Sequence, residues 1–137
     1  MSRNFTFPIG LGLQKIGLPL IIVQLFNNDL CLLLDTGSNQ NIIDKRIYEL
    51  LKNDIQLSDE IKQITTLKES LVDSFEVVLP FEFENMKYNE PFLCIENIEG
   101  FNAIKEESDI QLHGILGNNF FLKNGWIIDF DKIVVQQ

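Results

Sequence analysis

Apolar residues fall in short runs along the chain, and polar turn-forming residues separate these runs, a pattern typical of β-strands. Two runs, Ile21 to Phe26 and Leu30 to Leu34, flank Asn27-Asn28-Asp29, which favours a tight turn. The pattern predicts a hairpin whose second strand ends on Asp35. Because an unpaired carboxylate at the end of a buried strand is costly, Asp35 is the first candidate for chemistry.

A second hairpin is predicted in the middle of the chain. One strand runs from Phe75 to Phe83 and the other from Lys87 to Ile95, with the turn at Glu84-Asn85-Met86. Pro80 lies inside the first of these strands and has no backbone N–H to donate. We therefore expect this proline at a sheet edge or at a β-bulge.

Helical signals are confined to short segments. Asp44 is a suitable N-cap for a helix from Lys45 to about Lys52. The polar segment Glu99 to Glu107 is a second helical candidate, and Asn124-Gly125 marks a helix stop before a strand that begins at Trp126. We therefore expect a mostly β fold with one or two short helices.

Length and charge restrict the class of protein. A chain of 137 residues suffices for one compact domain, and we assign residues 1–137 to a single domain. Eleven basic and twenty acidic residues give a net charge of −9, which argues against nucleic acid or a membrane surface as partner. The most apolar N-terminal run, Ile16 to Phe26, is about half as long as a membrane span. Since we recognise no signal peptide, we expect a cytoplasmic protein.

Cysteine and histidine add little chemistry of their own. Cys31 and Cys94 lie in predicted strands among apolar neighbours, which indicates buried free thiols in a reducing compartment. No cluster has metal-ligand spacing, so we expect no metal and no cofactor. His113, the only histidine, is either a catalytic base or a turn residue before Gly114. The absence of a nearby nucleophile motif favours the turn.

The residues that follow the Asp35 strand form a motif, Asp35-Thr36-Gly37-Ser38. Its glycine permits a sharp turn past the strand, and its two hydroxyls are local hydrogen-bonding groups. A second element, His113 to Leu122, has the sequence His-Gly-Ile-Leu-Gly-Asn-Asn-Phe-Phe-Leu, and Trp126 to Phe130 follows as a strand. In this order and separation, the elements resemble those of retropepsin-like (retroviral-type) aspartic proteases, single-domain relatives of pepsin.

The resemblance implies a closed retropepsin-like β-barrel with one lobe per chain and with His113 to Leu122 beside the catalytic loop. The mechanism of this family needs two aspartates, yet the chain has no second Asp-Thr-Gly or Asp-Ser-Gly. The second carboxylate, Asp35′, must then come from another copy across a two-fold axis. The expected function is a homodimeric aspartic endopeptidase that cleaves a peptide or protein substrate with a water activated by the Asp35/Asp35′ dyad.

The resemblance also gives roles to the rest of the motif. Thr36 is expected to hydrogen-bond across the two-fold axis to the partner's loop, and Gly37 allows its peptide plane to approach the carboxylate. The Ser38 hydroxyl is expected within reach of the outer carboxylate oxygen. There it would stabilise the ionised form and move the pH optimum downward.

Two further features are expected to be structural. Asp129 also lies in an apolar strand, but it lacks the Thr-Gly that follows Asp35, so we assign it no catalytic role. Phe5-Thr6-Phe7 and Ile133-Val134-Val135 are apolar ends with no other obvious cover. As in retropepsins, we expect these terminal strands to pair between subunits.

One part of the resemblance is missing from the chain, namely a glycine-rich flap. No glycine occurs between Gly37 and Gly100, and Ile64 to Leu71 stands in the flap's place with Lys68-Glu69 near its tip. This difference keeps an alternative open: a non-catalytic dimeric domain of the same fold that binds peptides or acts as a scaffold. A monomeric domain in which Asp35 is an ordinary turn residue is the third possibility.

Overall fold

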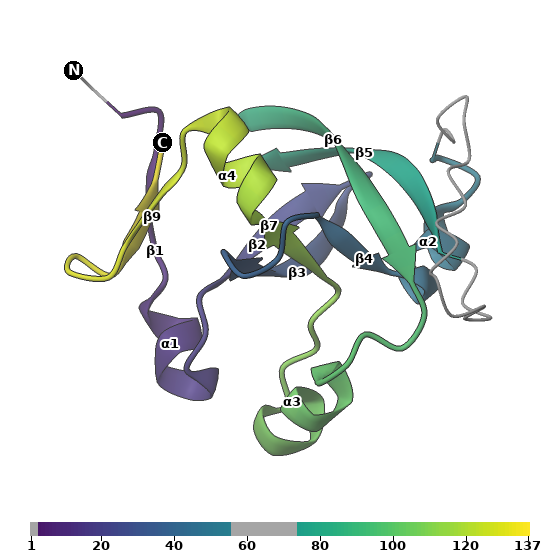
Figure 1. The fold of residues 1–137 in the computed structure, drawn as a ribbon, viewed down its shortest axis with the longest axis horizontal. Helices are drawn as coiled ribbons and strands as arrows, with labels where there is room; N and C mark the ends of the chain where they lie inside the picture. Colours follow the sequence, from purple (N-terminus) through teal and green to yellow (C-terminus); the bar gives the residue numbers. More distant parts are fainter. Residues whose placement is uncertain (1–2, 56–73) are drawn as a thin grey trace.

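The computed structural model describes residues 3–55 and 74–137, whose arrangement is shown in Figure 1. Six strands close into a barrel in the order β2-β3-β7-β4-β6-β5, and a separate sheet has the order β1-β9-β8. This mostly β architecture confirms the predicted fold class. In chain order the elements are β1 (Thr6–Pro8), α1 (Gly10–Ile16), β2 (Leu20–Leu25), β3 (Asn28–Asp35), β4 (Ile42–Asp44), α2 (Lys45–Leu51), β5 (Phe75–Phe83), β6 (Met86–Ile95), α3 (Phe101–Ser108), β7 (Gly114–Gly117), α4 (Asn118–Asn124), β8 (Ile127–Asp129) and β9 (Val134–Gln136).

The described residues contain four short helices, more than the one or two that the sequence pattern predicts. α2 and α3 occupy the predicted segments, and α4 ends at the predicted stop, where Gly125 adopts a left-handed C-cap at φ 66°. α1 escapes prediction because Gly10 and Gly12 are poor helix formers. A Cβ on Gly12 would lie 2.6 Å from the Leu20 side chain, so close packing requires glycine in this helix.

Both predicted hairpins form, and each has a two-residue turn. Phe26 and Asn27 (φ 48° and 64°) connect β2 to β3, and Glu84 and Asn85 (φ 49° and 65°) connect β5 to β6. Positive φ at both central positions matches the right-handed twist of the flanking strands. Each turn has two residues, where three were predicted. The first turn begins one residue earlier than predicted, at Phe26, because Asn28 and Asp29 already pair with β2, and the second turn lacks Met86 because Met86 pairs with Phe83.

Pro80 lies within β5, opposite Asn89 of β6. The register between these strands runs unbroken along the whole of β5, so the suggested bulge is absent from this hairpin. On its other side, β5 pairs with β2 only at Phe81 and Glu82, and Pro80 stands just beyond that pairing. Proline is tolerated where one side of a strand is unpaired, which agrees with the expected edge position.

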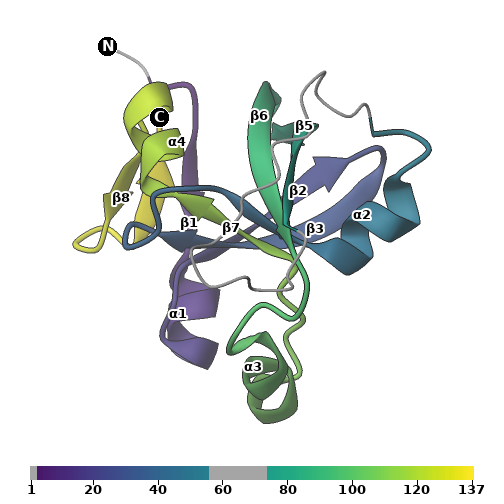
Figure 2. The same ribbon diagram turned by 45° about the vertical axis from the view of Figure 1, so that its right-hand side comes forward.

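The side chains of β3 alternate between two environments, and this alternation positions Asp35. The set that faces the barrel interior and joins the main core is Leu30, Leu32 and Leu34. The set on the other face is Cys31 and Leu33, which belong to a second cluster with Phe101 of α3. Asp35 follows the second set in this alternation and stands at the end of the strand. α1 and α3 lie next to each other below the barrel in Figures 1 and 2.

The N-terminal and C-terminal segments pair with each other within one chain. β1 is antiparallel to β9, with Phe7 opposite Val135, and β9 is antiparallel to β8. Phe5 and Val135 are buried in this arrangement. The predicted pairing of the terminal strands between subunits is therefore wrong, because strands of the same chain already cover these apolar ends. Figure 2 shows the resulting sheet at one side of the barrel.

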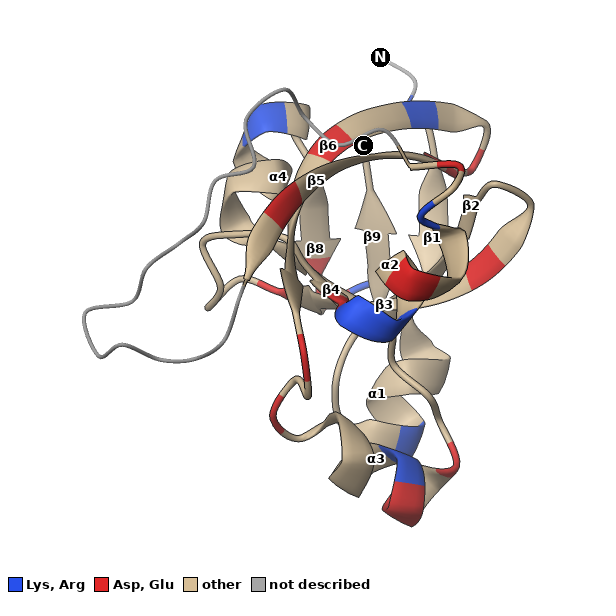
Figure 3. Ribbon diagram, turned by 90° about the vertical axis from the view of Figure 1, so that its right-hand side faces the viewer, with Lys and Arg blue, Asp and Glu red and all other residues tan. Residues whose placement is uncertain are grey.

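Charged side chains are distributed over several elements. In the view of Figure 3, acidic residues lie on α2, α3 and the β5–β6 hairpin, with lysine or arginine on the same elements. One ion pair ties α4 to β6, because Lys123 Nζ lies 2.9 Å from Oε2 of the buried Glu90. Within the described ranges, no helix is long and apolar enough to cross a membrane.

Candidate active site

Asp35 ends β3 and begins a tight turn. The Gly37 N–H donates a hydrogen bond to Asp35 Oδ1 at 2.9 Å, and the Ser38 N–H donates to the Asp35 carbonyl oxygen at 3.2 Å. A Cβ on Gly37 would stand 3.1 Å from the same Oδ1, so glycine gives the carboxylate its room. Within one chain Asp35 is partly buried and Thr36 is exposed. The carboxylate is thus fixed at the strand end but remains accessible.

The second motif element lies directly beside this turn. β7 runs parallel to β3, with Gly117 opposite Asp35, and the Asn118 N–H donates to the Ser38 carbonyl oxygen at 2.6 Å. A Cβ on Gly117 would lie 2.4 Å from the Gln40 carbonyl oxygen and 2.8 Å from that of Ser38. The backbone of the Asp35 loop therefore rests against the junction of β7 and α4, as the resemblance implies.

Asn41, which the sequence pattern does not single out, links the β3–β4 loop to two strands by hydrogen bonds. Its buried side chain accepts a hydrogen bond from the Gly117 N–H at 2.9 Å and donates to the Pro91 carbonyl oxygen at 3.1 Å. Its own carbonyl oxygen accepts from the Leu93 N–H at 2.9 Å. One asparagine thus joins the β3–β4 loop to both β7 and β6.

Ser38 contacts a different partner from the one predicted. Its hydroxyl donates to the Gln40 carbonyl oxygen at 2.8 Å, whereas the hydrogen bond to Asp35 Oδ1 comes from the Gly37 backbone. The expected contact between the Ser38 hydroxyl and the carboxylate is therefore not formed within one chain. Backbone geometry explains the difference, because the turn at Gly37 directs the hydroxyl toward the following loop.

Ser38→Ala is consequently expected to leave the acid limb of the pH–rate profile unchanged. The variant loses one loop hydrogen bond, so its free energy of unfolding should fall by about 1 kcal/mol. Urea unfolding and a pH profile of peptide cleavage measure the two effects separately. An acid limb that moves upward would restore the role in which the Ser38 hydroxyl stabilises the ionised carboxylates.

Thr36 borders a hollow of about 240 Å³ between the Asp35 loop and the C-terminal elements. The side chains around it are mostly apolar: Phe121, Leu122, Trp126, Ile128 and Phe130. Leu122 is 74% exposed and Phe130 is 59% exposed. The Asp35 loop therefore opens onto an apolar surface of the same chain.

His113 is held in a structural position. Its Nδ1 accepts a hydrogen bond from the Cys31 N–H at 2.9 Å, and its backbone N–H donates to the Cys31 carbonyl oxygen at 2.9 Å. Nδ1 must therefore be unprotonated in this arrangement. Burial lowers the pKa of His113 below its ordinary value, and the nearby Arg46 adds to this effect while Asp44 opposes it. These bonds support the predicted structural role.

Stability is accordingly expected to fall as the pH drops below about 6.5, the pKa of an unfolded histidine. Below that pH the histidine of the unfolded chain is protonated, whereas His113 of the folded chain, with its lowered pKa, stays neutral. Protonation therefore stabilises the unfolded state relative to the folded state. The slope from this residue is at most about 1.4 kcal/mol per pH unit. His113→Gln keeps an acceptor for the Cys31 N–H but does not titrate. Urea unfolding at pH 7.5 and 5.5 should show a smaller difference in this variant, and an equal difference would contradict the assignment.

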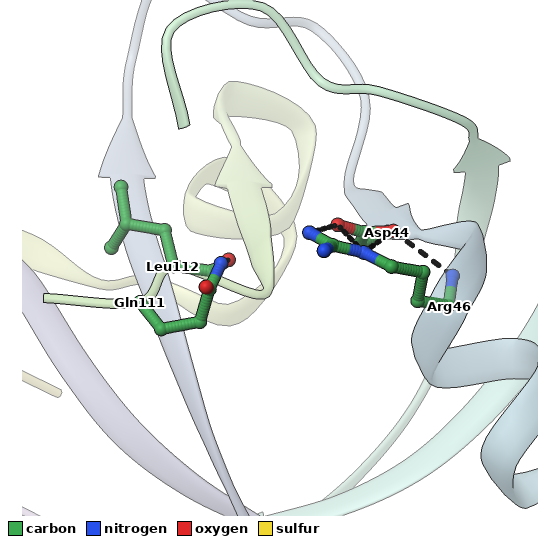
Figure 4. Close-up of polar contacts among 4 residues, drawn as sticks. All are labelled: Asp44, Arg46, Gln111 and Leu112. Carbon is green, nitrogen blue, oxygen red and sulfur yellow. Dashed lines mark hydrogen bonds and ion pairs between the residues drawn. The ribbon is translucent and has the colours of Figure 1, made fainter. Parts of the chain in front are cut away.

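The predicted N-cap of α2, the buried Asp44, forms an ion pair with the exposed Arg46 (Figure 4). The Asp44 side chain is 5% exposed, accepts from the Arg46 N–H at 2.9 Å and lies 2.7 Å from Arg46 Nη2. Burial alone would raise the pKa of Asp44, but the hydrogen bonds and charge of Arg46 hold it below its usual value. Figure 4 also shows Gln111, whose amide donates to the Leu112 carbonyl oxygen at 3.0 Å before β7. The Asp44 N–H donates to the His113 carbonyl oxygen at 2.8 Å, and this bond joins the end of β4 to the residue before β7.

The remaining candidates for reactive chemistry have structural surroundings. Cys31 and Cys94 are buried and free, as predicted, and burial raises the pKa of their thiols to about 11 and about 12. Both thiols are therefore protonated and unreactive at neutral pH. The Asp129 carboxylate accepts from the backbone N–H groups of Asp131 and Lys132, each at 2.9 Å, so it closes a turn.

The segment expected in the flap's place, Ile64 to Leu71, lies outside the described residues. Within the described ranges, no group of three or more histidine, cysteine or carboxylate side chains has an arrangement suited to a metal ion.

No protein-family model and no curated protein matches the chain, but solved structures do. A retropepsin-like aspartic protease from Rickettsia conorii superposes with a TM-score of 0.62 at 12% identity, covering 96% of this chain and 87% of that one. The retroviral protease-like domain of Ddi1 from Leishmania major gives 0.58 at 13% identity, with 83% and 82% covered. The EIAV protease in complex with the inhibitor HBY-793 gives 0.51 at 21% identity, with 79% and 88% covered.

These neighbours share one architecture, and they agree with the closed barrel that carries Asp35 at the end of β3. The resemblance first recognised from two short motifs is thereby confirmed at the level of the fold. The chain has the retropepsin-like fold.

Proposed function

We propose that this protein is a homodimeric aspartic endopeptidase, with residues 1–137 acting as one lobe of the active unit. The observation that carries the proposal is the Asp35 turn. The Asp35 carboxylate accepts a hydrogen bond from the Gly37 N–H at 2.9 Å. The loop that contains both residues packs against Gly117, and the chain has a retropepsin-like fold. The chain has a single Asp-Thr-Gly, so Asp35 of a second copy must supply the other carboxylate.

The proposed chemistry needs two carboxyl groups and a water. Two carboxyl groups a few ångströms apart do not both ionise readily, so the pair shares one proton. One carboxylate oxygen accepts a proton from the water as it attacks the scissile carbonyl, while the protonated carboxyl donates a hydrogen bond to that carbonyl oxygen. The tetrahedral intermediate then collapses with transfer of a proton to the leaving amine, and no covalent enzyme intermediate forms.

The loop residues have distinct supporting roles in this proposal. Thr36 is exposed, so its hydroxyl is free to bond to the equivalent loop of the partner subunit. The Gly37 N–H occupies Oδ1 of Asp35 and leaves the outer oxygen for water and substrate. The substrate class is a peptide or a protein, because the reacting groups are suited to amide hydrolysis and the mechanism requires no cofactor.

Binding of a statine-type inhibitor tests the shared dyad. Its hydroxyl mimics the tetrahedral intermediate and should displace the water between the two carboxyl groups. We expect one inhibitor per dimer, tightest binding at mildly acidic pH where the pair holds one proton, and a large loss of affinity in Asp35→Asn. Isothermal titration calorimetry gives both stoichiometry and affinity. Asp29→Asn, a change of the same kind at the exposed start of β3, serves as the control and should bind normally.

One inhibitor per monomer, or binding that is indifferent to Asp35→Asn, would contradict the shared dyad. A dimer that binds the inhibitor but cleaves no substrate would favour the non-catalytic peptide-binding or scaffolding alternative.

A further inference from the structure

α4 begins without a side-chain cap of its own, because the residue before it is Gly117. The free N–H groups of its first turn are bonded by the β3–β4 loop instead. The Asn118 N–H donates to the Ser38 carbonyl oxygen at 2.6 Å, and the Asn119 N–H donates to the Asn39 carbonyl oxygen at 3.4 Å. The loop that follows β3 therefore caps α4, and Figure 1 shows the two beside each other.

A third bond at this junction comes from a side chain. The Gly117 N–H, directly before α4, donates to Asn41 Oδ1 at 2.9 Å, and both groups are buried. Ser38 and Asn39 accept through carbonyl oxygens, which every residue possesses, so their contribution does not depend on their side chains. Asn41 accepts through its amide. This bond alone among the three therefore depends on which residue occupies its position.

Asparagine meets both hydrogen-bonding requirements of this buried position. Its amide oxygen accepts from the Gly117 N–H, and its amide nitrogen donates to the Pro91 carbonyl oxygen at 3.1 Å. A leucine of similar shape would leave both backbone groups without this partner, which is costly in a buried place. Asn41 is 8% exposed, so solvent has little access to replace the lost bonds.

The bond from Asn41 returns the loop to the residue that faces Asp35. In the parallel ladder of β3 and β7, Asp35 pairs with Gly117. From Asp35 the chain turns at Gly37, whose N–H donates to Asp35 Oδ1 at 2.9 Å, and it comes back to Gly117 at Asn41. Both ends of the loop are thus anchored at the same residue of β7. The N–H group that orients the carboxylate lies between the two anchors.

We infer that Asn41 is a positioning residue for the Asp35 pair, because its bond to Gly117 fixes the loop that holds the carboxylate and thereby the separation of the two carboxyl groups. The inference rests on the proposed function, since it needs Asp35 of the partner subunit. Two-fold symmetry doubles any error in position, because a shift of one carboxyl group relative to the axis is repeated by its copy. The separation of the pair decides how strongly the two groups share a proton.

Protonation of the pair tests this role without relying on turnover. The amide chemical shift of Gly37 in NMR should follow the Asp35 carboxylate, because the Gly37 N–H donates to its Oδ1. In the wild-type dimer we expect two titration steps, which belong to the pair as a whole. Asn41→Ser has a side chain too short to reach Gly117 but leaves room for a water molecule, so it should fold. Its two steps should move closer together by about one pH unit, because a loop that can relax lets the two like charges separate.

Turnover gives a second measurement. The kcat of Asn41→Ser should fall by about 10²-fold, the usual effect of a catalytic group displaced by about 1 Å, with little change in KM. Asn41→Asp keeps an oxygen that can accept the Gly117 N–H and should recover most of this loss, whereas Asn41→Leu has no acceptor and should not. An Asn41→Asp protein as slow as Asn41→Leu would contradict the role of the Gly117 bond. Because Asn41→Ser carries both measurements, the test does not depend on whether Asn41→Leu folds.

Val77→Ala is the matched control for a loss of stability alone. Val77 is fully buried in β5, outside the Asp35 loop, so its truncation lowers the urea midpoint by leaving a cavity in the core. The titration steps and kcat of this variant should match the wild type. A comparison at similar urea midpoints then separates positioning of the carboxylates from general stability.

The outcomes separate this inference from the proposed function. Two wild-type titration steps and a kcat that are both unchanged in Asn41→Ser overturn the positioning role but leave the peptidase intact. Steps that close up in Asn41→Ser, in a dimer that never cleaves substrate, support the positioning role and overturn the peptidase. A wild-type protein that titrates in a single step, or that forms no dimer, overturns both.

Discussion

Asp35→Asn is expected to reduce kcat for peptide cleavage by roughly 10⁴-fold or more. General acid and general base catalysis each contribute about 10²–10⁴-fold, and in the proposed mechanism both come from the Asp35 pair. Asparagine has nearly the same shape as aspartate and keeps an oxygen that can accept the Gly37 N–H, so the fold should persist. Cleavage of an unstructured protein at mildly acidic pH provides the measurement.

The control for this experiment is Asp29→Asn, on the same strand but at its far end, and its kcat should match the wild type. Sedimentation of Asp35→Asn should give a folded dimer, so that lost activity is not mistaken for lost assembly. If cleavage survives in Asp35→Asn, the reaction proceeds elsewhere and the dyad proposal is wrong.

Gly117→Ala is expected to damage both stability and activity. The new Cβ would lie 2.4 Å from the Gln40 carbonyl oxygen, 2.7 Å from its carbon and 2.8 Å from the Ser38 carbonyl oxygen. All three are backbone atoms, so no side-chain rotation relieves the overlap and the Asp35 loop must move. Overpacking of this kind costs about 1–3 kcal/mol, and a displacement of about 1 Å in a catalytic group lowers the rate roughly 10²-fold.

Gly10→Ala is the matched control, because a Cβ there meets only an ordinary contact of 3.5 Å with Ile133. It lies in α1, where alanine is the better helix former, so its free energy of unfolding should stay equal or rise slightly. Urea unfolding and kcat are measured for both variants. A Gly117→Ala protein with wild-type stability and rate would show that the loop tolerates displacement.

The features that sequence predicts well here are those fixed by neighbouring residues. Asn27 and Asn85 suit the left-handed backbone of two-residue turns, and both hairpins form around them. Asp44 caps α2 because its carboxylate reaches the N–H two residues ahead. The Asp35 turn belongs to the same class, since Gly37 closes it within three residues.

The features that escape prediction depend on contacts between distant segments. The sequence around Asn41 looks like that of any polar loop residue. Its side-chain amide links two strands only because Gly117 and Pro91, which are distant in the sequence, lie within hydrogen-bond distance of it. The terminal strands would present the same alternation whether they pair within a chain or between copies. They pair within the chain because the turn after β8 brings β9 back alongside β8, where it also reaches β1. The sequence pattern does not indicate whether the strands pair within one chain or between two copies.

The parallel pairing of β3 with β7 has a consequence for the folding of the protein during its synthesis. The bond from the Gly117 N–H to the Asn41 side chain closes a separation of 76 residues, and that from the Cys31 N–H to His113 closes one of 82. Contacts between residues so far apart in the sequence form slowly, because closing a long loop costs conformational entropy before the contact stabilises the chain. During synthesis, Asp35 leaves the ribosome long before the residues that brace its loop. The aspartate is therefore present in the nascent chain well before the site exists.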